Sequence, residues 1–104
     1  MKNKIISGLQ IKKVIKYLKK RGRKIVFTNG CFDLLHVGHV RYLQEAGSLG
    51  DCLIIGLNSD RSVRQIKDPY RPLISEDQRA EVLAALECVG YIVLFDEADP
   101  FKLI

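Results

Sequence analysis

Two histidines, His36 and His39, are separated by three positions and have Gly38 between them. This spacing places both imidazoles on one side of a helical turn, and the glycine leaves room for a ligand to approach the backbone. The apolar positions that follow predict a helix beginning near Val37 or Gly38, so both imidazoles meet at its first turn. A helix N-terminus attracts anions, and histidines there can donate hydrogen bonds in the neutral or the protonated form. The pattern predicts a polyphosphate site.

A zinc site is the alternative for the same residues. Cys31, His36 and His39 could supply three ligands, with Asp33 as a fourth. We favour the anion site, because Gly38 and the helix start suit an anion and no closed set of four ligands is evident. No metal ligand of the protein is therefore assigned from the sequence.

The elements that must position these histidines are those of an α/β fold. Three short apolar runs without polar alternation predict strands buried on both faces, as in a parallel sheet: Ile25–Asn29, Cys52–Leu57 and Tyr91–Phe95. The segments between them predict helices, so the chain should form a Rossmann-like parallel sheet covered by helices on both faces. With the strand order 3-2-1, the first strand lies at an edge.

The helices are indicated by their caps and periodicity. Ser7 and Gln10 form a capping box that opens a helix over about 8–21, and a short helix is expected over Arg61–Ile66. A second capping box, Ser75 and Gln78, predicts a helix that ends near Cys88 and buries Val82, Leu83 and Leu86. Two prolines make 67–74 a loop.

Composition predicts one small domain of 104 residues, 47% of them hydrophobic, in which the segment after the first helix, about 24–104, forms the core. No apolar run is long enough for a membrane span and the start lacks a signal-peptide core, so a cytoplasmic protein that does not engage a membrane is expected. Three cysteines without C-x-x-C spacing favour reduced thiols.

Charge is unevenly distributed along the chain. Residues 1–24 hold ten Lys or Arg and no acid, whereas residues 25–104 hold seven basic and twelve acidic residues. The basic residues cluster on the first helix, which has no interleaved aromatic pattern and no known nucleic-acid reader motif. A solvated helix face is favoured over a nucleic-acid surface.

The run TNGCFDLLHVGHVRYLQEA resembles the H-x-G-H signature of nucleotidyltransferases of the cytidylyltransferase type. Together with NSDRSVRQIK and EDQRAEVLAAL, it is most similar to the heptose 1-phosphate adenylyltransferase domain of ADP-heptose synthases, over about Lys24 to Pro100. The resemblance implies transfer of AMP from ATP to D-glycero-β-D-manno-heptose 1-phosphate with release of pyrophosphate. ADP-heptose serves lipopolysaccharide biosynthesis, and Mg²⁺ is expected to accompany ATP.

The same resemblance assigns roles to individual residues. His36, His39 and Lys67 are implied to be catalytic; Lys67 occupies the position of a family lysine that closes over the phosphates. Without the family match, Lys67 reads as a surface lysine. The residues implied to bind the nucleotide or its phosphates are Asn29, Gly30, Cys31, Phe32, Asp33, Gly38 and Arg79.

Two of these assignments leave a structural alternative open. Arg79 opposes the helix dipole in its first turn, so it needs an anion or carboxylate nearby; a surface pair with Glu76 or Asp77 is the simpler explanation. Asp33 fits the motif but could equally hold the turn together.

Two other functions fit parts of the sequence. A glycerol-3-phosphate cytidylyltransferase would more often read G-T-F-D where this chain reads Gly30-Cys31-Phe32-Asp33, so Cys31 argues mildly against it. A nucleic-acid-binding module would use the basic helix, and its binding would depend strongly on salt.

The end of the chain predicts that more of the domain is needed. Asp99 and Pro100 open a helix, but only four residues follow, too few to complete one. The resembling enzymes continue with a further strand and a Ser/Thr-rich motif, so we expect a C-terminally incomplete domain of low activity. The edge beside Ile25–Asn29 is expected to be open, faced by further residues, or covered by another chain such as the second copy of a homodimer.

Overall fold

Three parallel strands in the order β1-β2-β3 form the sheet that organises the chain. The structure is a computed structural model in which residues 3–96 are described. Along the chain the elements are α1 (Gly8–Lys20), β1 (Ile25–Gly30), α2 (Val37–Ser48), β2 (Cys52–Asn58), α3 (Asp60–Ile66), α4 (Glu76–Ala84) and β3 (Tyr91–Phe95). Both strand pairings are parallel, so the predicted sheet and its order are confirmed.

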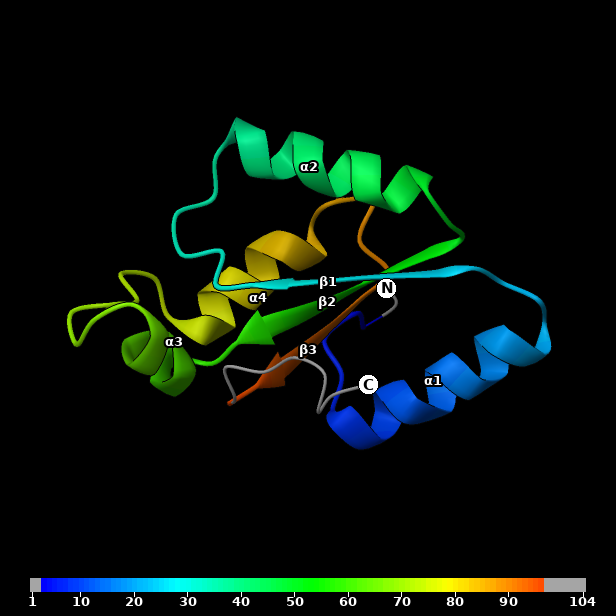
Figure 1. Cartoon of the computed structure of the whole chain (residues 1–104), viewed down its shortest axis with the longest axis horizontal. Coiled ribbons are helices and arrows are strands. Elements are labelled where there is room, and N and C mark those ends of the chain that lie inside the picture. Colours follow the sequence, from blue (N-terminus) through cyan, green and yellow to red (C-terminus); the bar gives the residue numbers. More distant parts are fainter. Residues whose placement is uncertain (1–2, 97–104) are drawn as a thin grey trace.

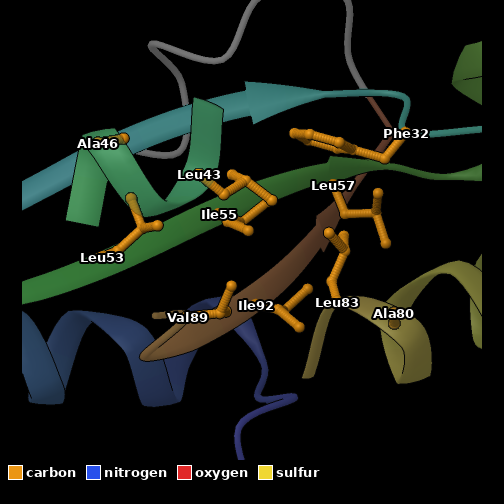
Figure 2. Packing of buried hydrophobic residues seen from close by; sticks show 10 residues of the cluster. All are labelled: Phe32, Leu43, Ala46, Leu53, Ile55, Leu57, Ala80, Leu83, Val89 and Ile92. Carbon is orange, nitrogen blue, oxygen red and sulfur yellow. The ribbon is translucent and has the colours of Figure 1, made fainter. Parts of the chain in front are cut away.

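Helices cover both faces of this sheet, as predicted. On one face, α2 and α4 pack their buried Leu43 and Leu83 against Leu53, Ile55 and Leu57 of β2 (Figure 2). On the other face, α1 packs Ile11 against Ile54 and Val93. Figure 1 shows α2 and α1 on opposite sides of the sheet. Successive side chains of β2 point to opposite faces of the sheet, and helices cover both faces, which explains why this strand has no polar face.

The sheet's carboxyl ends gather the loops that matter for function. All three strands run toward the end of the molecule where α3 lies and where α2 begins (Figure 1). The register pairs Gly30 with Leu57 and Asn58 with Phe95, so the last residues of neighbouring strands lie side by side. Ligands of open α/β sheets bind at this end.

The helix after the proline-containing loop is shorter than predicted. It ends at Ala84 instead of near Cys88, and Val82 is 49% exposed, so the prediction that Val82 is buried is wrong. The buried face consists of Arg79, Ala80 and Leu83. Leu86 packs against the core from the turn that follows, which brings Val89 to the start of β3. Of the predicted capping box, Ser75 caps the Gln78 amide.

A short N-terminal segment extends the sheet, which the sequence did not predict. Ile5 forms a parallel bridge with Ile92 of β3, supported by hydrogen bonds from the Ile6 amide to the Ile92 carbonyl and from the Ile92 amide to the Lys4 carbonyl. Within residues 3–96, β1 therefore stands at the sheet edge that no strand pairs. The helix predicted to open at Asp99 lies outside the described residues.

Of the helices between residues 3 and 96, none combines the length and the apolar character that crossing a membrane requires.

Candidate nucleotide-binding site

A cleft of about 810 Å³ opens at the carboxyl end of the sheet. Asn29 and Gly30 come from the end of β1, His39 and Tyr42 from α2, and Lys67 from the end of α3. Seven of the ten residues predicted for the site line this cleft: Asn29, Gly30, Cys31, Phe32, Asp33, His39 and Lys67. Parallel strands and the loops after them bring these residues together from positions up to 38 apart in the sequence.

His36 and His39 cap the start of α2 reciprocally. The Nδ1 of His36 accepts a hydrogen bond from the Gly38 amide at 3.0 Å, and the Nδ1 of His39 accepts one from the His36 amide at 3.2 Å. The arrangement is a capping box built from two histidines instead of serine and glutamate. α2 begins at Val37, as predicted.

This capping fixes the chemistry of both imidazoles. A neutral imidazole whose Nδ1 accepts a hydrogen bond carries its hydrogen on Nε2. The ring centroids of His36 and His39 lie 4.1 Å apart, so the two rings form one unit at the helix start. His36 is exposed and His39 is half-buried beside the cleft. The pair can therefore offer two Nε2–H donors.

The electrostatics favour the neutral form of His39. Burial, reinforced by the neighbouring His36, lowers the pKa of His39 from its ordinary value of 6.5. At neutral pH the ring keeps its Nδ1 as an acceptor, and the cap on His36 remains intact. His39 can therefore face a polyphosphate as a neutral Nε2–H donor.

Gly38 contributes to the cap at the start of α2. A Cβ added at Gly38 would lie 2.7 Å from Cε1 of His36, closer than real Cβ contacts come. The His36 imidazole occupies the space where a side chain at position 38 would begin, so the cap requires a glycine here. The Gly38 amide also donates its hydrogen bond to that imidazole.

The loop between β1 and α2 holds a strained residue. Phe32 has a φ of 48°, a left-handed value that a bulky side chain rarely adopts. Its ring is buried, lies 2.9 Å from where a Cβ on Gly30 would stand, and makes an edge contact with His39 at 5.9 Å between centroids. Such strain costs about 1–3 kcal/mol and persists where surrounding packing enforces it. Gly30 is needed because the Phe32 ring folds over it.

Asp33 lines the cleft and anchors the loop 67–74. Its two carboxylate oxygens accept hydrogen bonds from the amides of Leu73, at 2.9 and 3.0 Å, and Ile74, at 2.9 Å. Arg71 adds an ion pair at 3.5 Å. The structure thus supports the alternative in which Asp33 holds the turn together, and it shows which turn: the segment that follows Lys67.

These contacts predict an acid-sensitive loop. Burial alone would raise the pKa of Asp33, but hydrogen bonds from the Leu73 and Ile74 amides and from Arg71 outweigh it, so the pKa falls below its ordinary value of 3.8. Because its pKa is lower in the folded state, ionised Asp33 stabilises the fold at pH values above 3.8. This stabilisation is lost as the pH falls through the lowered folded-state pKa.

Asp33→Asn should cost about 1–2 kcal/mol of unfolding free energy near neutral pH. Urea unfolding at about pH 6 and about pH 3 measures this cost. The difference in unfolding free energy between wild type and variant should be smaller at the lower pH. A gap that stays constant or widens with acid would show that Asp33 is not an ionised anchor.

Arg79 is a buried structural hub beneath the cleft. Its side chain is 1% exposed, and Nη1 donates to the carbonyls of Cys31 at 2.6 Å and Asn58 at 2.8 Å. Nε donates to the Ile74 carbonyl at 2.9 Å, and Nη2 pairs with Asp60 at 2.8 Å. The carboxylate expected near this cation is therefore Asp60, not Glu76 or Asp77. The structure does not bring the Arg79 side chain to the cleft lining.

Sequence reasoning missed several residues of the cleft. Tyr42 follows His39 by three positions on α2, and Asn58 ends β2 directly beside the end of β1. Helical spacing from His39 would have indicated Tyr42. The rule that the ends of parallel strands meet at one edge of the sheet would have indicated Asn58. The other lining residues that the sequence did not indicate are Leu34, Val63, Ile66, Asp68 and Arg71.

The fold and the cleft define a protein of the nucleotidyltransferase class: the chain belongs to the cytidylyltransferase-like family, which matches residues 27–104. Its relatives include the "Bifunctional protein HldE" of Wolinella succinogenes, 58% identical over 97% of this chain, and that of Geobacter metallireducens, 64% identical over 88%. The chain spans about a fifth of the length of these relatives, 21% and 19% respectively.

A solved structure has the same fold. The "lipopolysaccharide core biosynthesis protein" from Thermoplasma volcanium superposes with a TM-score of 0.69 and 32% identity, covering 77% of this chain and 64% of its own. The resemblance to cytidylyltransferase-type enzymes predicted from the H-x-G-H motif is confirmed.

Proposed function

We propose that the chain catalyses adenylyl transfer from ATP to a sugar 1-phosphate, D-glycero-β-D-manno-heptose 1-phosphate, in ADP-heptose synthesis. An oxygen of the sugar phosphate attacks the α-phosphorus of ATP, the bond from that phosphorus to the bridging oxygen breaks, and pyrophosphate leaves. Relatives named HldE and a similar structure named for lipopolysaccharide core biosynthesis support this pathway.

The observation that carries the proposal is the reciprocal capping of His36 and His39. It leaves the Nε2–H of each ring as a donor at the N-terminus of a twelve-residue helix. His39 and Lys67 line the cleft, whereas His36 is exposed beside His39 and is not part of the lining. The reaction needs no protein nucleophile, because both reacting groups belong to the substrates. Donors fixed before the charge develops stabilise the transferring phosphoryl group, and Lys67 would stabilise the departing pyrophosphate.

The remaining residues position these groups. Phe32 and Gly30 shape the turn that approaches the phosphates, and Asp33 holds the loop after Lys67. The Arg79 guanidinium donates hydrogen bonds to the loop after β1, to the end of β2 and to Ile74. These bonds would hold the segments around the cleft in fixed positions relative to one another.

Mg²⁺ is proposed to enter with ATP and supplies charge neutralisation on the triphosphate. Within residues 3–96, no group of three or more His, Cys, Asp or Glu side chains is placed to hold a metal ion. The Asp33 carboxylate is occupied by backbone amides. The donor set therefore suits an ion bound mainly by phosphate oxygens and water, as Mg²⁺ often is. Because both substrates are cellular metabolites, we place the reaction in the cytoplasm.

A pyrophosphate-release assay tests the proposal. ATP and CTP compete against a panel containing the heptose 1-phosphate, other sugar 1-phosphates and glycerol 3-phosphate. We expect release that requires both ATP and the heptose 1-phosphate, with ATP preferred by about tenfold or more in kcat/KM. Preference for CTP with glycerol 3-phosphate would assign the chain to the cytidylyltransferase alternative. Salt-dependent nucleic-acid binding without any release would overturn the enzymatic function.

A further inference from the structure

Thr28 and Tyr42 form a pair of hydroxyl groups, of which Tyr42 lines the cleft and Thr28 lies behind it. Thr28 Oγ1 and the Tyr42 hydroxyl lie 2.9 Å apart and join β1 to α2. Thr28 is only 8% exposed, whereas Tyr42 is 53% exposed and lines the cleft. The pair thus has one buried member and one member that faces the ligand space.

The buried threonine fixes the exposed tyrosine. An exposed tyrosine hydroxyl can be satisfied by water and needs no protein partner. Here the Thr28 hydroxyl holds it, so the Tyr42 ring is oriented before any ligand arrives, which lowers the entropy cost of binding. Each hydroxyl has one donor and two acceptor lone pairs, so the pair keeps capacity for a further hydrogen bond.

The position of Tyr42 indicates which part of a ligand it meets. It follows His39 by three residues on α2, a spacing that places side chains about 5–6 Å apart on one helix face. A ligand whose phosphate contacts His39 therefore presents its adjoining group to Tyr42. In both substrates of the proposed reaction, the group that adjoins the reacting phosphate is a sugar: the ribose beside the α-phosphate of ATP, and the acceptor sugar beside its 1-phosphate.

We propose that Tyr42, oriented by Thr28, is a sugar-binding residue. Its hydroxyl exchanges a hydrogen bond with a sugar hydroxyl while its ring packs against the apolar face of the sugar. This inference rests on the proposed function. The sugar is either the ribose of ATP or the acceptor sugar, which share the chemistry that Tyr42 recognises.

Tyr42→Phe tests the inference, because it removes the hydroxyl and keeps the ring. The matched control is Tyr17→Phe, since Tyr17 is 55% exposed, lies on α1 and contacts Arg21 at 4.6 Å instead of lining the cleft. KM is measured separately for ATP and for the heptose 1-phosphate in the full-length protein. Tyr42→Phe should raise one KM about three- to tenfold, the loss of one hydrogen bond, while Tyr17→Phe changes neither.

The substrate whose KM rises identifies the sugar. A rise for ATP, matched by weaker discrimination against 2′- or 3′-deoxy-ATP, assigns Tyr42 to the ribose; a rise for the heptose 1-phosphate assigns it to the acceptor. Thr28→Val should raise the same KM, and the double variant should add little to Tyr42→Phe, because both act through one hydroxyl.

Equal KM values for Tyr42→Phe and Tyr17→Phe would overturn the inference while leaving the proposed function intact. If the wild type released no pyrophosphate, the proposed function would fail. The same variants would then be compared by Kd in calorimetric titrations with ATP and with heptose 1-phosphate. Equal Kd values for the two variants would again overturn the role of Tyr42.

Discussion

Replacing His36 by asparagine and His39 by glutamine is expected to abolish most turnover while leaving the fold intact. Asparagine is a favoured N-cap residue and glutamine is a favoured third residue of a capping box, so both replacements can keep the hydrogen bonds that the two Nδ1 atoms now accept. Neither supplies the imidazole Nε2–H, and the amide NH2 group that each brings donates from a different position. The pair of substitutions therefore separates capping from catalysis.

Each single variant should lower kcat by about a hundredfold or more, the usual effect of removing a transition-state donor, with smaller changes in KM. Thermal unfolding of the same variants is the control, and Tm should stay close to wild type. Alanine at either position should add a loss of about 1 kcal/mol from the missing cap. If kcat survives in the asparagine and glutamine variants, both histidines have only a structural role.

The second large effect is expected on stability. Arg79→Met keeps an unbranched side chain but removes every donor, which leaves the carbonyls of Cys31, Asn58 and Ile74 without the guanidinium. Because Arg79 is 1% exposed, water cannot easily replace these bonds. We expect a loss of about 3 kcal/mol or more in unfolding free energy, measured by urea denaturation. Arg79→Lys should also be destabilising, since one ammonium cannot reproduce the planar fork.

Arg71→Met is the matched control for this substitution. Arg71 also pairs with a carboxylate, Asp33, but its side chain is 43% exposed and the ion pair is 3.5 Å long. Such pairs contribute about 0–1 kcal/mol. Similar losses for the two arginines would contradict the assignment of Arg79 as the buried hub.

Much of the fold could be predicted because its signals are local. Ser7 and Gln10 form the predicted capping box, α2 begins at the predicted residue, and the three apolar runs became the three strands with end shifts of one residue at most. A continuous apolar run predicts burial on both faces, and parallel pairing follows from helical connections between such strands.

The features that were missed depend on contacts distant in the sequence. Arg79 finds its partners in backbone carbonyls, which every residue carries and which leave no trace in a sequence pattern. The bond between Thr28 and Tyr42 joins two elements, and the bridge from Ile5 to Ile92 spans nearly the whole chain. Histidine caps are unusual, so the pair at 36 and 39 indicated an anion site but not the hydrogen bonds that fix its protonation.

The protonation state of the two imidazoles decides whether His36 and His39 form a preorganised pair of phosphate donors. The chain has two histidines, so long-range ¹⁵N–¹H correlation spectra of the purified chain contain two imidazole signal sets. At neutral pH we predict that both rings carry hydrogen on Nε2 and none on Nδ1, and that Mg·ATP shifts both Nε2 signals. A hydrogen on Nδ1 of either ring, or Nε2 signals that do not move at saturating Mg·ATP, would contradict the claim that His36 and His39 form a preorganised pair of phosphate donors.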